Sequence, residues 1–149
     1  MTGGCAGNGR SPIRSGRNDR ISSLDWEEDH ERERLEQAGS LAQLVSELGA
    51  DGDEVVVAGD LNTPPDRPEL KPLLAVLDDC WRPHGYDGAT YSSHNSYVGH
   101  GEWLEDQRIA YILVNDGLTS RASRLVGFDE DRGRPPSDHY AVVTDVPVG

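Results

Sequence analysis

Apolar side chains recur at helical spacing in the first half of the chain. Between Asp25 and Gly49 they return every three or four positions, as they do on one face of an α-helix. Ser22, with Asp25 three residues later, resembles a capping box, and Gly49 is a typical residue at a helix end. The pattern predicts a helix that begins near Asp25 and stops at Gly49. Its apolar positions are Leu35, Ala38, Leu41, Ala42, Val45 and Leu48.

Strand patterns dominate the rest of the chain. Three consecutive valines within Glu54–Asn62 predict a strand that is buried on both faces. Leucines at helical spacing predict a second, shorter helix that starts near Pro72. An order of helix, strand, helix and then several strands is typical of a mixed α/β fold. The later strands are predicted over 108–114, 120–126 and 140–146, with a weaker one over 90–92.

Residues 1–24 differ in composition from the remainder of the chain. They are rich in Gly, Ser, Asn and Arg and contain few apolar side chains that could offset the loss of chain entropy. We therefore expect residues 1–24 to be disordered and residues 25–149 to form the folded domain. A nucleic-acid-binding tail is the alternative, which the small number of arginines disfavours.

The charge of the chain bears on its partners. It has 27 acidic and 14 basic side chains, a formal net charge of −13. An acidic surface repels phosphate backbones, so we do not expect nucleic acid as a partner. No apolar run approaches the roughly 18 residues of a transmembrane helix. We expect a location in the cytoplasm or at a membrane surface.

Two short polar segments adjoin predicted strands and could carry chemistry. They are Gly59-Asp60-Leu61-Asn62 and Ser137-Asp138-His139. If the strands are neighbours, two carboxylates, an amide and an imidazole meet at one end of a sheet. This set suits metal-assisted phosphoester hydrolysis, because carboxylates bind Mg²⁺, the cation neutralises phosphate charge and histidine transfers protons. Taken singly, each segment is also common in turns and loops.

These segments carry a resemblance to a known family. In this order, Gly59-Asp-Leu-Asn62, Arg108-Ile-x-Tyr111 and Ser137-Asp-His139 resemble the C-terminal half of the endonuclease/exonuclease/phosphatase (DNase I-like) superfamily. Gly127-Phe-Asp129, followed by Arg132-Gly-x-Pro135, is most similar to neutral sphingomyelinases. The resemblance implies a partial DNase I-like α/β/β/α sandwich, here mainly one mixed sheet with helices on one face.

The resemblance also implies a role for each site residue. Asp60 would activate or position the attacking water, Asn62 would bind the scissile phosphate, and Asp138 would hold Mg²⁺. His139 would act as the general base or as a phosphate-binding imidazole, and Thr90 would support the substrate site through its hydroxyl. The implied reaction is Mg²⁺-dependent hydrolysis of sphingomyelin to ceramide and phosphocholine. The implied partner is a phosphodiester small molecule or a phospholipid head group.

The chain departs from the family pattern in two ways. Ala110 stands where the family has an Asp that orients the catalytic His, and loss of such a carboxylate in other hydrolases costs orders of magnitude in rate. The family's N-terminal half, with its metal-binding Glu, has no match here, and neither has the Thr-His-Leu strand that precedes the helix containing Gln37. We therefore expect activity to be weak or absent.

Two alternatives stay open. The chain could be a catalytically inactive fragment, or a nuclease or inositol-phosphate phosphatase of the same fold. A half-sandwich would also leave the inner face of its sheet uncovered, and an uncovered apolar face predicts self-association.

Overall fold

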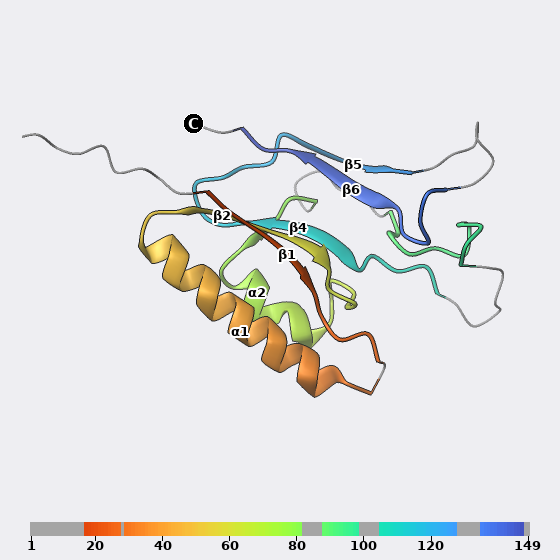
Figure 1. Ribbon diagram of the computed structural model, residues 1–149, viewed down its shortest axis with the longest axis horizontal. Helices are drawn as coiled ribbons and strands as arrows, with labels where there is room; N and C mark the ends of the chain where they lie inside the picture. Colours follow the sequence, from red (N-terminus) through yellow and green to blue (C-terminus); the bar gives the residue numbers. More distant parts are fainter. Residues whose placement is uncertain (1–16, 28, 82–87, 99–104, 128–134, 148–149) are drawn as a thin grey trace, which may run out of the picture.

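A four-stranded sheet lies in the middle of the structure, between two helices on one side and a two-stranded sheet on the other (Figure 1). The computed structural model describes residues 17–27, 29–81, 88–98, 105–127 and 135–147. The partial sandwich expected from the resemblance is therefore present, with three layers instead of one covered sheet. No helix in these ranges is long and apolar enough to cross a bilayer.

The larger sheet has the order β1-β2-β4-β3 and mixes parallel with antiparallel pairing. β1 (Arg17–Ser23) runs parallel to β2 (Glu54–Asp60), which pairs antiparallel with β4 (Ala110–Val114). The two-residue strand β3 (Asp78–Asp79) pairs with the other edge of β4. The second sheet is an antiparallel pair.

The antiparallel pair consists of β5 (Ala122–Val126) and β6 (Ala141–Asp145). It lies over β4 on the side away from the helices (Figure 1). The strands predicted over 108–114, 120–126 and 140–146 are thus present, with shorter bounds, as β4, β5 and β6. The weaker prediction over 90–92 yields only isolated bridges from Tyr91 to Gln107 and to His139.

β1 corrects the expectation that residues 1–24 are disordered. Its backbone pairs with β2 along its whole length, from Arg17 opposite Glu54 to Ser23 opposite Asp60. Leu24, which comes directly after β1, is only 5% exposed and belongs to the main core. The family's Thr-His-Leu strand is expected to have no match here, and β1 occupies its position before the first helix. Composition misled here because backbone pairing does not require apolar side chains; residues 1–16 lie outside the described ranges.

The first helix, α1 (Glu31–Ala50), begins six residues later than predicted. The capping box is wrong, since Ser22 lies in β1. Asp25 instead shapes the loop before the helix: its Oδ1 accepts the N–H of Glu27 at 3.0 Å, and its Oδ2 lies 3.1 Å from His30 Nδ1. The spacing of Ser22 and Asp25 therefore belongs to a turn and not to a helix start, because an aspartate side chain can accept backbone N–H groups in either place.

The predicted second helix forms as two short turns, η1 (Pro68–Leu70) and α2 (Lys71–Leu74). Both pack against α1. The core between these helices and the sheet takes alternate residues of β2, since Val55 and Val57 are fully buried. Further members come from both layers: Leu24, Ala38, Ala42, Val45, Leu61, Leu70, Leu73, Leu77, Tyr111 and Leu113.

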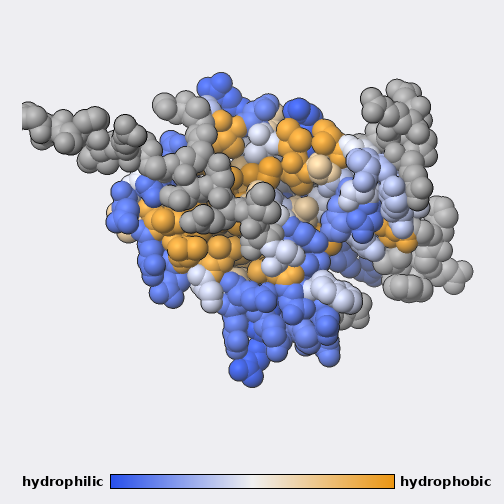
Figure 2. Space-filling model, in the orientation of Figure 1, coloured by the Kyte–Doolittle hydropathy of each residue, from blue (hydrophilic) through white to orange (hydrophobic). Residues whose placement is uncertain are grey.

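The other face of the sheet is only partly covered. Val56 and Ile112 are half-buried against the small cluster of Cys80, Val114 and Leu118. The expectation that β2 is buried on both faces therefore holds for one face only. Figure 2 shows hydrophobic side chains over the sheets and hydrophilic ones along the helical side. The expected self-association through this face stays a prediction.

A buried ion pair joins β3 to the start of β4. Arg108 Nη2 lies 2.6 Å from Asp79 Oδ2, and the Arg108 guanidinium lies 4.5 Å from the centre of the Tyr111 ring. Asp79 is 6% exposed and also accepts the N–H of Trp81 at 3.1 Å. Burial raises the pKa of Tyr111, so its hydroxyl keeps its proton and donates. Its single proton is shared between the carbonyl oxygens of Thr63 at 2.7 Å and Arg108 at 3.0 Å.

Replacement of Arg108 by methionine tests this ion pair. It leaves the Asp79 carboxylate buried without its cation, so we expect the free energy of unfolding to fall by about 3 kcal/mol. Urea unfolding followed by circular dichroism measures the change. The double variant Arg108→Met/Asp79→Asn has no buried charge and should recover much of the loss. Equal losses in the two variants would contradict the assignment.

The loop before α1 makes stability depend on pH. The Asp25 carboxylate beside it raises the pKa of His30, and the N–H of Glu27, followed by His30, lowers the pKa of Asp25. A histidine whose pKa is raised by folding stabilises the protein below its ordinary pKa of about 6.5 and loses this effect as the pH rises through the folded value. Wild-type protein should therefore exceed His30→Gln in stability at about pH 6 and approach it at about pH 9. Thermal unfolding at both pH values checks this, and a constant difference would contradict it.

Candidate functional site

The turn at the end of β2 fixes two of the predicted site residues. Asp60 Oδ1 accepts the N–H of Asn62 at 2.9 Å, which is an Asx turn. Asn62 has a φ of +47°, a left-handed conformation that asparagine adopts more readily than most residues. Its Nδ2 donates to the carbonyl of Leu24 at 2.8 Å. Asn62 is therefore held both by its own turn and by the segment that leaves β1.

The segment before β6 is fixed by short polar contacts. Ser137 Oγ donates to Asp138 Oδ1 at 3.1 Å and accepts the N–H of His139 at 3.1 Å. Asn95, which is 1% exposed, donates from Nδ2 to the Ser137 carbonyl at 2.8 Å. Tyr91 bridges to His139 through the backbone, and the two ring centroids are 5.2 Å apart. Asn95 and Tyr91 thus position a segment more than 40 residues away.

These two segments meet. His139 Nε2 lies 3.7 Å from Asp60 Oδ2, and the two side chains are 27% and 30% exposed. Asn62, Asp138 and His139 line one cavity of about 900 Å³, whereas Asp60 and His139 line a second of about 430 Å³. Four of the five site residues predicted from the sequence therefore converge at one end of the sheet. Their chemical roles stay predictions.

Thr90 is buried and holds two backbone segments near the site by hydrogen bonds. It is 0% exposed, and its Oγ1 accepts the N–H groups of Ile109 at 2.9 Å and Ala110 at 3.0 Å. Its carbonyl accepts the N–H of Tyr140 at 2.8 Å. Thr90 thereby joins the start of β4 to the residue after His139. The support through its hydroxyl is visible, and direct contact with substrate stays a prediction.

Ala110 and His139 line the same smaller cavity. Asp106, a carboxylate in the segment before β4 that could replace the missing one, is engaged elsewhere. It accepts the N–H of Ser93 at 2.7 Å and the hydroxyl of Ser92 at 2.8 Å. These hydrogen bonds, the one from the Ser93 N–H foremost, lower the pKa of Asp106. Within the described ranges, the carboxylate that approaches His139 is that of Asp60.

Carboxylates at the site suit a hard cation. Asp138 is exposed at the mouth of the larger cavity and offers oxygen ligands, which Mg²⁺ prefers. Among the described residues, one group of three potential ligands lies within metal-binding reach, formed by Glu27, Asp29 and His30 in the loop before α1. It contains none of the predicted site residues. The carboxylate of Asp138 fits Mg²⁺ in donor type, and an ion bound there would need further ligands besides this carboxylate.

Sequence reasoning missed most of the walls of the larger cavity. They come from the loop before α1, from α1 itself, from the segment after Asn62 and from the segment before β4. One signal was available: Arg34 lies one turn before Ala38, on the apolar face of the helix, where a charged side chain needs a buried partner. That partner is Glu69, with Arg34 Nη2 3.6 Å from its Oε1. The wall residues beyond the predicted site are Trp26, Glu31, Arg34, Thr63, Pro64, Arg67, Glu69, Tyr91, Glu105, Gln107 and Ile109.

The chain belongs to the Endonuclease/Exonuclease/phosphatase family, whose model matches residues 9–139. The match includes β1, α1 and every predicted site residue. It confirms the superfamily resemblance. The segment with the particular similarity to sphingomyelinases, 127–135, lies largely outside the described ranges. Enzymes of this superfamily generally use divalent metal ions.

Solved structures share the fold at low sequence identity. TDP2 from D. rerio, complexed with a single-strand DNA product, has a TM-score of 0.74 and 21% identity over 87% of this chain and 56% of its own. TDP2 from C. elegans has a TM-score of 0.72 and 22% identity over 85% of this chain and 40% of its own. The catalytic domain of human Nocturnin, with a bound sulfate anion, has a TM-score of 0.65 and 20% identity over 87% of this chain and 46% of its own. The chain thus spans about half the length of these structures.

A comparison with curated protein sequences finds no match.

Replacement of Thr90 by valine tests its supporting role. Valine keeps the shape but removes the acceptor of one buried and one partly buried N–H group, and an unsatisfied buried donor costs about 1–3 kcal/mol. We expect the free energy of unfolding to fall by about 2–4 kcal/mol. Thr90→Ser retains the oxygen and should lose far less. Denaturant unfolding of both variants measures this, and similar stabilities would show that the hydroxyl contributes little.

Proposed function

We propose that this site hydrolyses a phosphodiester in the manner of a sphingomyelin phosphodiesterase, with Mg²⁺ as the cation. The observation that carries the proposal is the meeting of His139 with Asp60, 3.7 Å apart, beside Asn62 at a large cavity. An imidazole, a carboxylate and an amide at one place can move a proton and bind a phosphoryl oxygen. The family membership supports phosphoester hydrolysis as the reaction class.

The proposed reaction is in-line attack of water on phosphorus. A bond forms between the water oxygen and phosphorus, the bond from phosphorus to the ceramide oxygen breaks, and the water proton passes to the protein. In this proposal Asp60 and His139 accept that proton and relay it to the ceramide oxygen, and the second N–H of Asn62 binds a phosphoryl oxygen. Mg²⁺, held by Asp138, would neutralise phosphate charge. The ceramide oxygen leaves protonated, and phosphocholine is the second product.

The net charge favours a zwitterionic substrate over a polyanion. The phosphocholine head group is neutral overall, so the charge of −13 repels it less than it repels a nucleic acid. The D. rerio TDP2 structure contains single-strand DNA, which makes a nuclease the alternative to be measured beside it.

Release of phosphocholine from sphingomyelin micelles tests the proposal. We expect slow turnover with Mg²⁺ and none with EDTA, and we expect His139→Ala to lose at least about 100-fold in rate. His94→Ala serves as the matched control, because His94 is exposed and lines neither cavity. Single-stranded DNA of mixed sequence is assayed in parallel. Cleavage of DNA alone would favour the nuclease, and no turnover by folded protein would favour an inactive fragment.

Restoration of a carboxylate at position 110 is a second test. Ala110 lies opposite Asp60 in the β2–β4 register, and Asp60 approaches His139, so an aspartate at position 110 would lie on the same side of the sheet as the imidazole and could orient it. We expect Ala110→Asp to raise kcat by about 10- to 100-fold with little change in KM. Ala110→Asn, which matches the shape without the charge, is the control. An equal effect of both substitutions would contradict the orienting role.

A further inference from the structure

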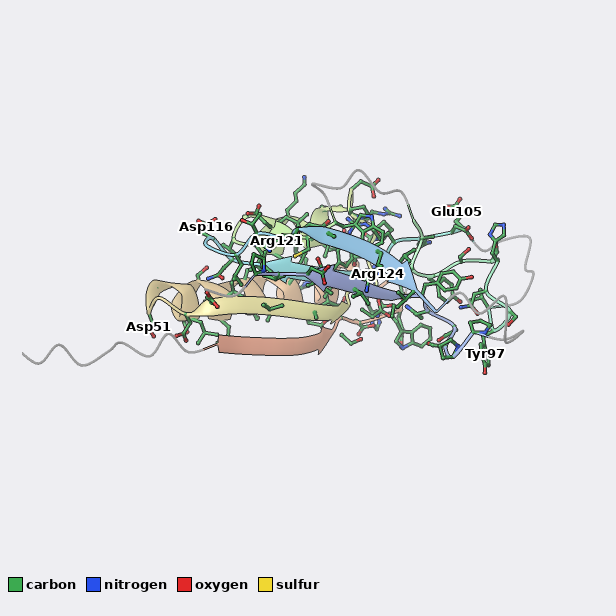
Figure 3. All side chains as sticks on the ribbon, turned by 90° about the horizontal axis from the view of Figure 1, so that it is seen from above. Asp51, Tyr97, Glu105, Asp116, Arg121 and Arg124 are labelled. Carbon is green, nitrogen blue, oxygen red and sulfur yellow. The ribbon has the colours of Figure 1, made fainter. Side chains whose placement is uncertain are left out.

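The larger cavity has the size of a ligand site. Its volume of about 900 Å³ falls within the roughly 300–1,000 Å³ that small-molecule sites occupy. The proposed catalytic residues form only part of its lining. Other walls come from the loop before α1, where Trp26 is 74% exposed, and from the segment before β4, where Glu105 is labelled in Figure 3. A substrate could therefore contact more of this cavity than its phosphate requires.

Two buried polar groups in the cavity lining have unused hydrogen-bonding capacity. Thr63 is 1% exposed and Glu69 is 4% exposed, and both line the cavity. Within the described residues, neither Thr63 Oγ1 nor Glu69 Oε2 has a hydrogen-bond partner. The other carboxylate oxygen of Glu69 faces Arg34 at 3.6 Å. Buried polar atoms are nearly always paired in folded proteins, so these two atoms point to a missing partner. Both atoms are shielded from solvent, so a ligand in the cavity completes them when the Thr63 and Glu69 side chains turn toward it.

The chemistry of the two atoms defines what can complete them. A carboxylate oxygen can only accept, so Glu69 needs an O–H or N–H donor. The Thr63 hydroxyl can donate or accept, which a second hydroxyl matches. A quaternary ammonium group has no N–H and satisfies neither atom. The complementary group is therefore a free hydroxyl, or a hydroxyl beside an N–H, near the phosphate.

We propose that Thr63 and Glu69 form a subsite for a hydroxyl on the alcohol side of the phosphoester substrate. The proposal rests on the proposed function, since it assumes that the phosphate binds near Asn62 and His139. The ceramide moiety of sphingomyelin carries such a hydroxyl and an amide N–H. A diacyl phospholipid with the same head group has its hydroxyls esterified. The subsite thus selects between lipids that share phosphocholine.

A pair of soluble probes tests the subsite without turnover. Glycerol 3-phosphate and n-propyl phosphate have the same phosphate and the same number of carbons, and only the first carries hydroxyls. Isothermal titration calorimetry with Mg²⁺ present measures the affinity of each. We expect wild-type protein to bind glycerol phosphate about tenfold more tightly, the equivalent of one well-made hydrogen bond.

Variants assign the preference to the subsite. Thr63→Val removes the hydroxyl and keeps the shape, so the affinity for glycerol phosphate should fall toward that for propyl phosphate, and Thr63→Ser should restore it. Glu69→Gln replaces an acceptor-only group with one that also donates, and should reduce the preference as well. Thr119→Val is the matched control, because Thr119 is exposed and lines a different cavity.

The outcomes are distinct. A preference for glycerol phosphate that Thr63→Val abolishes and Thr119→Val retains supports the subsite. Equal affinities in wild-type protein, a preference that survives Thr63→Val, or no binding of either probe overturns it. If the preference holds but sphingomyelin is not hydrolysed, the proposed function fails while the hydroxyl subsite stands. If sphingomyelin and phosphatidylcholine are hydrolysed equally well, the subsite fails while the proposed function stands.

Discussion

The pairing of β2 with both of its neighbours is the constraint on which the site depends. Its register sets Ser23 and Ala110 opposite Asp60, and it brings the Leu24 carbonyl within reach of the Asn62 amide. The N–H of Leu61 continues the contact by donating to the Ile109 carbonyl at 2.8 Å. Since a slip of one residue would turn every side chain to the opposite face, the site and the core are fixed by the same hydrogen bonds.

The sequence predicted the parts of this arrangement that depend on local pattern. Val55 and Val57 mark the central strand, and Asp60 and Asn62 mark the turn after it, because valine runs and Asx turns are properties of a few adjacent residues. β1 was missed because its position is determined by pairing with a strand more than 30 residues away. The start of α1 was misplaced because Asp25 caps a turn by the same chemistry that caps a helix.

The candidate site was predictable in its chemistry and not in its surroundings. Family resemblance led to Asp60, Asn62, Asp138 and His139, and the structure brings them together. Thr63 and Glu69 belong to no motif. Glu69 is buried in η1, which packs against α1, and Thr63 is buried in the segment after Asn62. Thr90 could be named from the sequence, but only the structure reveals that one hydroxyl serves two backbone N–H groups.

The left-handed backbone of Asn62 limits how this position can evolve. Glycine would accept the backbone and lose the amide. Aspartate would accept it too, but under the proposed phosphate-binding role it would bring a negative charge toward the phosphate. A larger side chain would strain the turn whatever its chemistry. The backbone conformation and the proposed phosphate contact thus restrict this position separately, and few residues other than asparagine meet both demands.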